Sequence, residues 1–286
     1  MQKIVLSLEN ARKMLPVRDP FGHKGSFGKV LLLCGSLGYT GAAWFSAMGA
    51  LRSGTGLVFL GVPQSIYAIE AVKLNEPVLF PLPDQEGIFS REAAETIRSR
   101  LPSADAVLVG CGIGRSEGAE AMVGAVLSEA ECPVVLDADG ISAAAAHKDI
   151  LRRRTAPTIL TPHDGEFLRI GGILQEDRLA AAAALSGELN AIVLLKGHRT
   201  CITDGKIGYI NETGNSGMAK GGSGDILAGL ITGLLGQGMA PLEAAACGAC
   251  FHGAAGDLAA RNLSQYSMLP TDLLTVLPQI IRREGM

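Results

Sequence analysis

Short apolar runs alternate with longer segments of helical period between residues 29 and 197. The runs are nearly continuous, which is typical of parallel strands that helices cover on both faces. They are KVLLLCG (29–35), GLVFLGV (56–62), DAVLVGCG (105–112), PVVLDAD (133–139), PTILTP (157–162) and AIVLLKG (191–197). Helical candidates lie between them at 42–52, 91–100, 118–130 and 176–189. This order predicts an α/β fold whose mostly parallel sheet is sandwiched between helices.

The pattern changes after Gly197. The stretch TCITDGKIGYIN contains two short alternating runs around Asp204 and Gly205, a dipeptide suited to a tight hairpin turn, so we expect a β-hairpin here. Three more helical segments follow at 225–235, 241–261 and 271–283. Because no linker, low-complexity tract or fixed-period repeat interrupts the chain, we expect a single domain over residues 1–286.

Composition and charge narrow the classes of partner. The 286 residues include 25 basic and 28 acidic ones without a run of like charge, which argues against nucleic-acid and membrane partners and favours small molecules. The uncharged stretch 226–242 is rich in glycine and contains Gln237 and Pro241, so a buried core helix is the better interpretation than a membrane span. The polar segment 1–15 and six scattered cysteines suggest reduced thiols and a cytoplasmic location.

Cys247 and Cys250 form a CxxC within a long helical run. Their spacing places them on one face of a helix, and neither a second cysteine pair nor a histidine at zinc-finger spacing accompanies them. We therefore expect both side chains to pack in the core, and redox or zinc chemistry is the alternative.

Ligands of open parallel sheets bind at the carboxyl ends of the strands, so the residues after each run are the candidates for a site. These segments are GSLGYTGAA (35–43), GCGIG (110–114), DAD (137–139), TPHDGEF (161–167) and KGHRT (196–200). The GCGIG segment has neither the spacing nor the place of a dinucleotide fingerprint, which argues against a redox fold. Asp137 and Asp139 are candidates for a metal or a ribose, although Asp139 would also suit a helix cap.

A glycine cluster precedes the helical segment that begins near Asp225. Gly221, Gly222 and Gly224 would leave backbone N–H groups free to bind an anion at the positive end of that helix. Lys196 and Lys220 are candidates to neutralise phosphate charge. The alternative is that the glycines allow tight helix packing and that Asp225 is only a cap.

Asp225 and His163 are the two candidates for direct chemistry. A helix N-terminus favours the ionised form of a carboxylate, so we expect Asp225 to be a weak base that stays charged and that orients or deprotonates a substrate hydroxyl. His163 follows Pro162, whose fixed backbone angle would turn the imidazole into the cleft. A structural hydrogen-bonding role is equally open for this histidine.

Taken together, these segments resemble one known family. GYTGAA, ALRSGTGLV, VGCGIGR, DADG, TPHDGEF, LLKGHRT and MAKGGSGDILAG, in this order, are similar to the ADP-dependent NAD(P)H-hydrate dehydratases of the ribokinase-like superfamily. The similarity extends from about Lys24 to Thr271. It implies a three-layer α/β/α fold and the repair of hydrated nicotinamide cofactors, in which the S epimers of NADHX and NADPHX are dehydrated at the expense of ADP, with release of AMP and phosphate.

The resemblance also implies roles for individual residues. Asp225 would be the catalytic residue. The hydrated cofactor would contact Ala42, Gly112, Gly114, His163 and Asp225. The nucleotide would contact Lys196, Gly197, His198, Arg199, Thr200 and Gly224. The anion hole that receives the phosphoryl group would consist of Gly221, Gly222, Ser223 and Gly224. Mg²⁺ would bridge the phosphates, with Glu166 as a candidate ligand through water.

Two further expectations come from the resemblance. It implies a homo-oligomer, with a tetramer suspected. The segment NEPVLF (75–80) departs from the His-Pro-Glu pattern that is usual at this place, which affects the local loop and any subunit contacts there. The rival hypotheses are a small-molecule kinase of the same superfamily and a non-catalytic nucleotide-binding module, which would need neither Asp225 nor Lys196.

Overall fold

The apolar runs of the sequence become strands of one ten-stranded sheet. The computed structural model describes residues 1–282, and the strands lie in the order β1-β12-β11-β10-β9-β8-β7-β2-β3-β4. Neighbouring strands are parallel apart from β11, which is antiparallel to both β10 and β12, so the predicted hairpin is confirmed. The strands are β1 (Gln2–Val5), β2 (Lys29–Leu33), β3 (Leu57–Pro63), β4 (Val78–Leu82), β7 (Ala106–Val109), β8 (Val134–Leu136), β9 (Thr158–Leu160), β10 (Ile192–Leu195), β11 (Cys201–Thr203) and β12 (Ile207–Ile210). A separate small ladder pairs β5 (Asp84–Gln85) with β6 (Ile88–Phe89).

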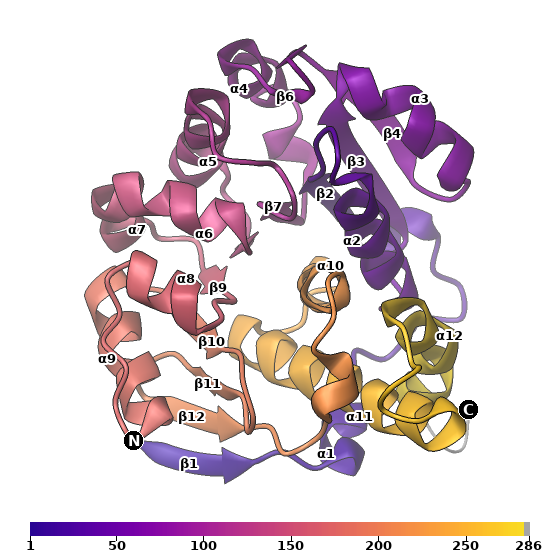
Figure 1. Ribbon diagram of the computed structural model, residues 1–286, viewed down its shortest axis with the longest axis vertical. Helices are drawn as coiled ribbons and strands as arrows, with labels where there is room; N and C mark the ends of the chain where they lie inside the picture. The colour runs from indigo at the N-terminus through magenta and orange to yellow at the C-terminus, as the bar shows by residue number, and fades with distance from the viewer. Residues whose placement is uncertain (283–286) are drawn as a thin grey trace.

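Helices cover both faces of the sheet, which gives the predicted three layers (Figure 1). One apolar cluster lies under α1 (Leu8–Met14), α2 (Thr40–Arg52), α3 (Gln64–Lys73), α10 (Ser223–Gly236), α11 (Pro241–Leu263) and α12 (Pro270–Ile281). A second lies under α4 (Arg91–Ile97), α5 (Glu117–Glu129), α6 (Asp139–Ala144), α7 (Lys148–Arg153), α8 (Asp164–Arg169) and α9 (Arg178–Leu189). Short 3-10 turns lie at Lys24–Phe27, Leu101–Ser103, Ala145–His147 and Ser216–Met218.

Some elements differ from the expected ones. The segment 75–80, expected to be a local loop, leads into the edge strand β4, where Pro81 is tolerated because proline lacks the N–H that an inner strand would have to pair on both sides. β1, for which no strand was predicted, pairs in parallel with β12 at the opposite edge of the sheet. The last helix ends at Ile281, and Arg283, the predicted end, lies outside the described residues. Within residues 1–282, every helix is too short or too polar to cross a bilayer.

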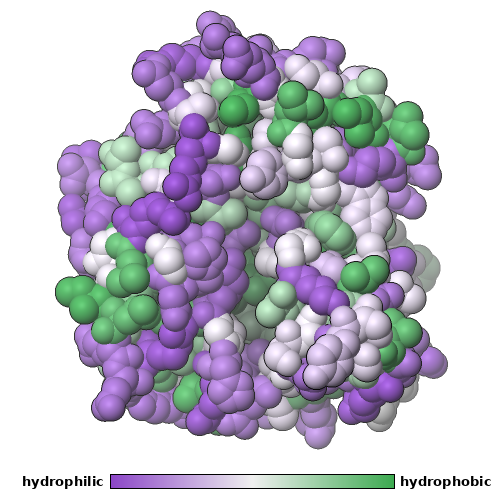
Figure 2. All heavy atoms as spheres, viewed as in Figure 1, coloured by the Kyte–Doolittle hydropathy of each residue, from purple (hydrophilic) through white to green (hydrophobic). Residues whose placement is uncertain are grey.

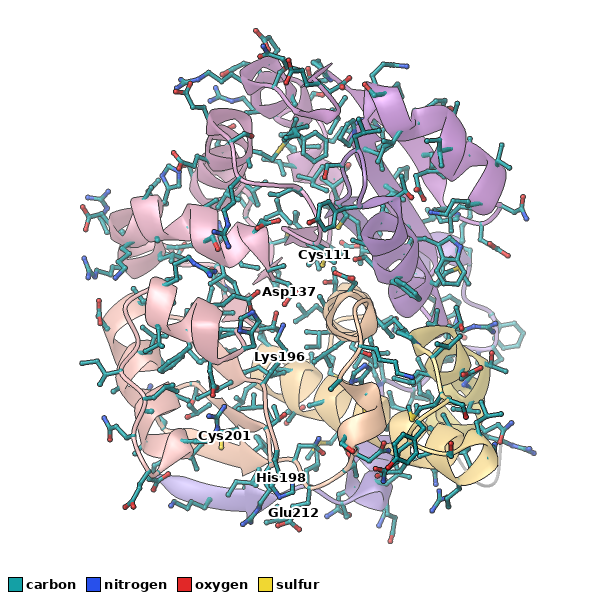
Figure 3. All side chains as sticks on the ribbon, in the orientation of Figure 1. Cys111, Asp137, Lys196, His198, Cys201 and Glu212 are labelled. Atoms are coloured by element: carbon teal, nitrogen blue, oxygen red, sulfur yellow. The ribbon has the colours of Figure 1, made fainter. Side chains whose placement is uncertain are left out.

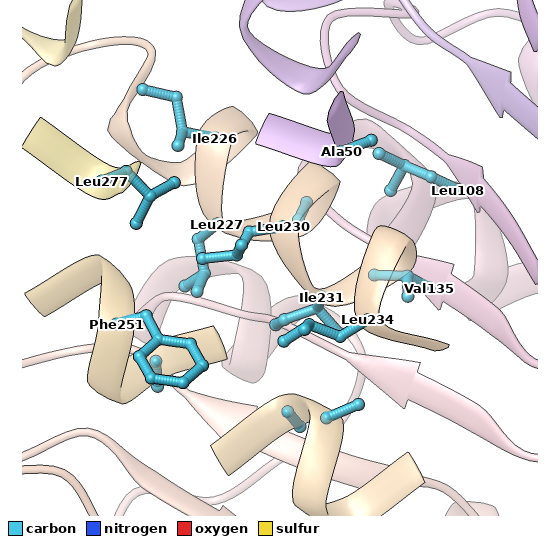
Figure 4. Packing of buried hydrophobic residues seen from close by; sticks show 14 of the residues in the cluster. Ala50, Leu108, Val135, Ile226, Leu227, Leu230, Ile231, Leu234, Phe251 and Leu277 are labelled. Atoms are coloured by element: carbon cyan, nitrogen blue, oxygen red, sulfur yellow. The ribbon is translucent and has the colours of Figure 1, made fainter. Parts of the chain in front are cut away.

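α10 is buried along almost its whole length, which confirms the prediction of a core helix for the uncharged stretch. Its apolar side chains pack against α2, α11, α12 and the underlying strands. In Figure 4, Leu230, Ile231 and Leu234 lie between Leu108 and Val135 of the sheet and Phe251 of α11. This packing fixes the N-terminus of α10 beside the carboxyl ends of the central strands.

Two glycines let α2 and α10 approach backbone to backbone. A Cβ on Gly229 would overlap the carbonyl oxygen of Ser46, and one on Gly49 would overlap that of Ile226.

We therefore expect Gly229→Ala to destabilise the fold by about 1–3 kcal/mol, because the helices must separate. Urea denaturation measures this change. Gly187→Ala is the control, because a Cβ there meets no atom within 4 Å and alanine favours the α9 helix by about 0.5–1 kcal/mol. Wild-type stability of Gly229→Ala would contradict the packing.

The cysteines are all unpaired. Cys247 and Cys250 are fully buried on α11, so the expectation that this CxxC packs in the core is confirmed. Burial raises the pKa of Cys247 to about 12 and that of Cys250 to about 11, which makes both poor nucleophiles at neutral pH.

Candidate active site

The candidate residues gather where β7, β8, β9 and β10 end and where α2 and α10 begin. In the space-filling view the surface is hollowed near its centre, beside the N-terminus of α10 (Figure 2). Parallel strands place the segments that follow them on one edge of the sheet, which explains why residues far apart in the sequence meet there.

Lys196, Asp137 and Thr161 form a buried polar network at the floor of this site. The Lys196 Nζ donates to Asp137 Oδ1 at 2.9 Å, and Thr161 Oγ1 donates to the same oxygen at 2.6 Å. Glu166 Oε2 lies 3.7 Å from the same Nζ. Burial alone would lower the pKa of Lys196, but the carboxylates of Asp137 and Glu166 outweigh it and hold that pKa above its usual value. Lys196 therefore carries a positive charge at the strand end (Figure 3).

His163 is both a helix cap and a partner of Glu166. Its Nδ1 accepts a hydrogen bond from the N–H of Gly165 at 3.0 Å, so the proton of the neutral ring belongs to Nε2. That Nε2 lies 3.2 Å from Glu166 Oε1, while Glu166 Oε2 accepts from the His163 N–H at 2.9 Å. His163 therefore has the structural hydrogen-bonding role that the sequence left open. Its side chain nevertheless remains 58% exposed.

The start of α10 is shaped to receive an anionic group. Gly222 is the N-cap with φ of 102°, and no side chain caps the helix. The Ser223 N–H donates to the Lys220 carbonyl oxygen at 3.2 Å, whereas the N–H groups of Gly224 and Asp225 have no side-chain acceptor among the described residues. A Cβ on Gly224 would lie 3.4 Å from Lys196 Nζ and 3.9 Å from Asp137 Oδ2. The Ser223 hydroxyl is buried and has no hydrogen-bond partner in residues 1–282. A phosphoryl group fits this cradle, because it needs N–H and O–H donors and a nearby cation.

Lys220 does not take the expected place beside this cradle. Its Nζ donates to the carbonyl oxygens of Tyr266 and Met268 in the segment after α11. The prediction that Lys220 neutralises phosphate charge is therefore wrong for this arrangement. Lys196 supplies the cation at the start of α10.

Asp225 has a different protonation state from the expected one. Burial raises its pKa from 3.8 to about 7, and the neighbouring Asp137 carboxylate adds to this effect. A hydrogen bond with Cys111 and the charge of Lys196 oppose the rise without cancelling it. The expectation of a permanently charged weak base is wrong, because the helix N-terminus is outweighed by desolvation and a second carboxylate. Asp225 is instead able to take up and give back a proton near neutral pH.

Three of the predicted cofactor-contacting residues, Ala42, Gly112 and Gly114, lie on the α2 side of the site. Ala42, in the first turn of α2, faces Gly112 so closely that a Cβ on Gly112 would lie 2.7 Å from that of Ala42. The N–H of Gly114 donates to Asp139 Oδ2 at 3.1 Å. Asp139 is thus not the helix cap that the sequence suggested, since Ala138 occupies that position, and it holds the glycine turn.

The KGHRT segment divides after its first residue. Lys196 belongs to the buried network, whereas Arg199 pairs with Glu212 at 2.7 Å and Thr200 Oγ1 donates to the carbonyl of Gly197 at 3.0 Å. His198 lies near Glu212 and away from Lys196 in Figure 3. Gly197, His198, Arg199 and Thr200 therefore form the loop that leads to β11 rather than part of the charged cluster.

Cys111 is the residue of this site that the sequence did not single out. Its thiol donates to Asp137 Oδ2 at 3.5 Å and lies beside Asp225. The only signal for Cys111 in the sequence was its position directly after a strand. Its apolar neighbours share this position, so the position alone did not distinguish it.

Comparison with known proteins identifies the family. A family model described as NAD(P)H-hydrate dehydratase matches residues 30–279. The chain belongs to this NAD(P)H-hydrate dehydratase family. An ADP-dependent (S)-NAD(P)H-hydrate dehydratase from Bacillus subtilis is 34% identical over 284 residues, which cover 96% of this chain and 96% of the relative. The bifunctional NAD(P)H-hydrate repair enzyme Nnr of Moorella thermoacetica is 44% identical over 278 residues, which cover 95% of this chain and 52% of the relative.

Solved structures agree with this family assignment. An ADP/ATP-dependent NAD(P)H-hydrate dehydratase from Bacillus subtilis, co-crystallized with ATP and Mg²⁺, has a TM-score of 0.81 and 31% identity, with 96% of each chain covered. The matching structures include a ribokinase-like superfamily protein, which confirms the predicted fold class. This member of the dehydratase family spans about half the length of the bifunctional relatives that it matches.

Proposed function

We propose that this chain catalyses the ADP-dependent dehydration of the S epimers of NADHX and NADPHX, with release of AMP and phosphate. The observation that carries the proposal is the position of Asp225 in the first turn of α10, next to an uncapped glycine-rich helix start and to Lys196. This arrangement offers a base for an alcohol and a cradle for a phosphoryl group within one site. The names of full-length relatives support the choice of substrate.

The chemistry avoids hydroxide, which is a poor leaving group. Asp225 takes the proton of the cofactor hydroxyl as the hydroxyl oxygen attacks the β-phosphorus of ADP, and the bond to the bridging oxygen breaks to release AMP. Phosphate then leaves with the electrons of the C–O bond, the ring nitrogen assists, and loss of a proton from the neighbouring carbon restores the double bond. The α10 cradle and Lys196 stabilise the charge on the transferring group.

The expected cofactor is Mg²⁺, with ADP as co-substrate. A bound Mg²⁺ would neutralise phosphate charge during transfer. Glu166 offers the hard carboxylate oxygen that Mg²⁺ prefers and lies on the Lys196 side of the cradle, so it would hold the ion through water. The relative co-crystallized with ATP and Mg²⁺ supports this part of the proposal.

The remaining assignments follow the family. The hydrated ring would rest against Ala42, Gly112 and Gly114 with His163 above it, and the ADP nucleotide would follow the loop from Gly197 to Thr200. We further propose one domain and a homo-oligomer, with four subunits expected by light scattering.

The test is an assay with chemically hydrated NADH, ADP and Mg²⁺. Recovery of the absorbance of the reduced nicotinamide with one AMP per turnover is the expected result. A stable phosphorylated product would assign the chain to the kinases instead. Nucleotide binding without turnover would leave only a binding module and overturn the proposal.

The pKa of Asp225 predicts a pH profile. Four groups face this carboxylate: Asp137 and Glu166 raise its pKa, while Cys111 and Lys196 lower it. Because the base must be ionised, kcat/KM should fall about tenfold per pH unit below pH 7 and level off above it. A profile that is flat between pH 5 and 8 would show that another group accepts the proton.

A further inference from the structure

Three donor atoms of different chemistry converge at the floor of the site. Cys111 follows β7, Asp137 follows β8 and Asp225 belongs to the first turn of α10, and one ligand atom from each lies within 4.8 Å of the others. Figure 3 places Cys111 directly beside Asp137, above Lys196. The proposed reaction uses Asp225 and the Asp137–Lys196 pair but gives no role to the thiol.

The free atoms of these residues point toward one another. Asp137 Oδ1 is occupied by Lys196 and Thr161, at 2.9 and 2.6 Å, whereas Oδ2 faces the Cys111 Sγ at 3.5 Å. The thiol of Cys34 adjoins that of Cys111, so a second sulfur lies beside the group. Cys111 and Asp137 are buried, and Asp225 is only partly buried, which leaves an approach from the hollow.

The donor set selects a class of ion. Mg²⁺ takes oxygen ligands in octahedral geometry, whereas a thiolate with two carboxylates and one open position suits a tetrahedral ion of the Zn²⁺ class. Ligands of such an ion lie roughly 3.3–3.8 Å apart, given metal–ligand bonds of about 2.0–2.3 Å, so small side-chain shifts close the site. A thiolate and two carboxylates beside Lys196 carry a net charge of about −2, which a divalent ion balances.

We propose that Cys111, Asp137 and Asp225 bind a thiophilic divalent cation of the Zn²⁺ class and that this ion inhibits the enzyme. Binding displaces the Cys111 proton, and any proton on Asp225, to solvent, and the sulfur and carboxylate electron pairs form the bonds to the metal. The ion then occupies the carboxylate that serves as base. The inhibition rests on the proposed function, whereas the binding does not.

The experiment uses Co²⁺ as a spectroscopic probe and Zn²⁺ as competitor, in excess Mg²⁺ and without nucleotide. The wild-type protein should bind one Co²⁺ per chain with a thiolate-to-cobalt charge-transfer band, which one equivalent of Zn²⁺ abolishes. Cys111→Ser should lose the band and bind Zn²⁺ at least about tenfold more weakly, since a ligand is lost. Cys132→Ser, which alters a thiol outside the site, should keep both properties. A wild-type protein without the band, or a Cys111→Ser variant that retains it, would overturn the site.

A second arm measures turnover of hydrated NADH. Equimolar Zn²⁺ should inhibit the wild-type enzyme, and a chelator selective for Zn²⁺ over Mg²⁺ should restore the rate. Binding without inhibition would overturn the inhibitory role while leaving the site intact. If the protein shows no dehydration at all, the Co²⁺ spectrum still decides whether the metal site exists, so the two proposals fail separately.

Discussion

Asp225→Asn is expected to lower kcat by about 10²–10⁴-fold, the usual contribution of a positioned general base. Asparagine has nearly the same size but cannot accept the hydroxyl proton, so the cradle at the start of α10 stays intact. The affinity for ADP, measured by calorimetry, should therefore remain close to that of the wild-type protein. Steady-state kinetics with hydrated NADH gives the rate.

Asp164→Asn is the matched control for this variant. Asp164 is an exposed carboxylate at the start of α8 that pairs with Arg178 at 2.7 Å, outside the buried network. Its substitution removes a charge at a helix start without touching the proposed base, and kcat should stay near the wild-type value. Near-normal turnover in Asp225→Asn would refute the role of this residue, whatever the control shows.

The same substitution should change stability in a pH-dependent way. The folded state holds the Asp225 pKa at about 7, above the 3.8 of an ordinary carboxyl, so ionisation penalises the folded state as the pH rises from about 4 to 7. Asp225→Asn removes this penalty, and the variant should be more stable than the wild type at pH 8 by about 2–4 kcal/mol and by much less at pH 4. Urea denaturation at the two pH values tests this, and an equal difference at both would contradict the raised pKa.

The central strands could be predicted because each is an uninterrupted apolar run between two helix layers. β4 was missed since Pro77 precedes it and Pro81 lies within it, and proline counts against a strand until its edge position is known. β1 was missed for a related reason: its four mostly exposed residues at an edge belong to only a short apolar run, which polar residues soon interrupt. Local sequence therefore predicts the buried centre of the sheet well and its edges poorly.

The candidate site could be located from sequence because strand ends and helix starts are local features. The protonation of Asp225 could not, since its pKa depends on burial and on Asp137, which lies 88 positions earlier in the numbering (225 − 137) and reaches it only through the sheet order. Lys220 was misassigned because the carbonyl oxygens that bind its Nζ belong to a segment after α11. A charged residue beside a motif can therefore be assigned to a ligand only when the protein groups that compete for its side chain are known.

Glycines near the start of α10 could serve either close helix packing or the approach of a phosphoryl group to the backbone, and Gly224→Ala distinguishes these two explanations. Gly49 and Gly229 meet backbone oxygens of the opposite helix, so they serve close packing. A Cβ at Gly224 would meet only the Lys196 amine at 3.4 Å and an Asp137 oxygen at 3.9 Å. The amine lies at the end of a flexible side chain, and alanine favours a helix by about 0.5–1 kcal/mol, so the variant should fold with nearly wild-type stability.

Its activity should nevertheless fall, because the added methyl group projects toward the space that the phosphoryl group needs. A displacement of the reacting group by about 1 Å costs about 10²-fold in rate, and we expect kcat/KM of Gly224→Ala to fall by at least this factor. Gly187→Ala is the control, since a Cβ there meets no atom within 4 Å and α9 lies outside the proposed site, so its kcat/KM should be close to the wild-type value. Wild-type kcat/KM in Gly224→Ala would mean that the phosphoryl group does not approach this backbone, whereas equal losses in both variants would point to an effect of the added methyl group that is not specific to the site.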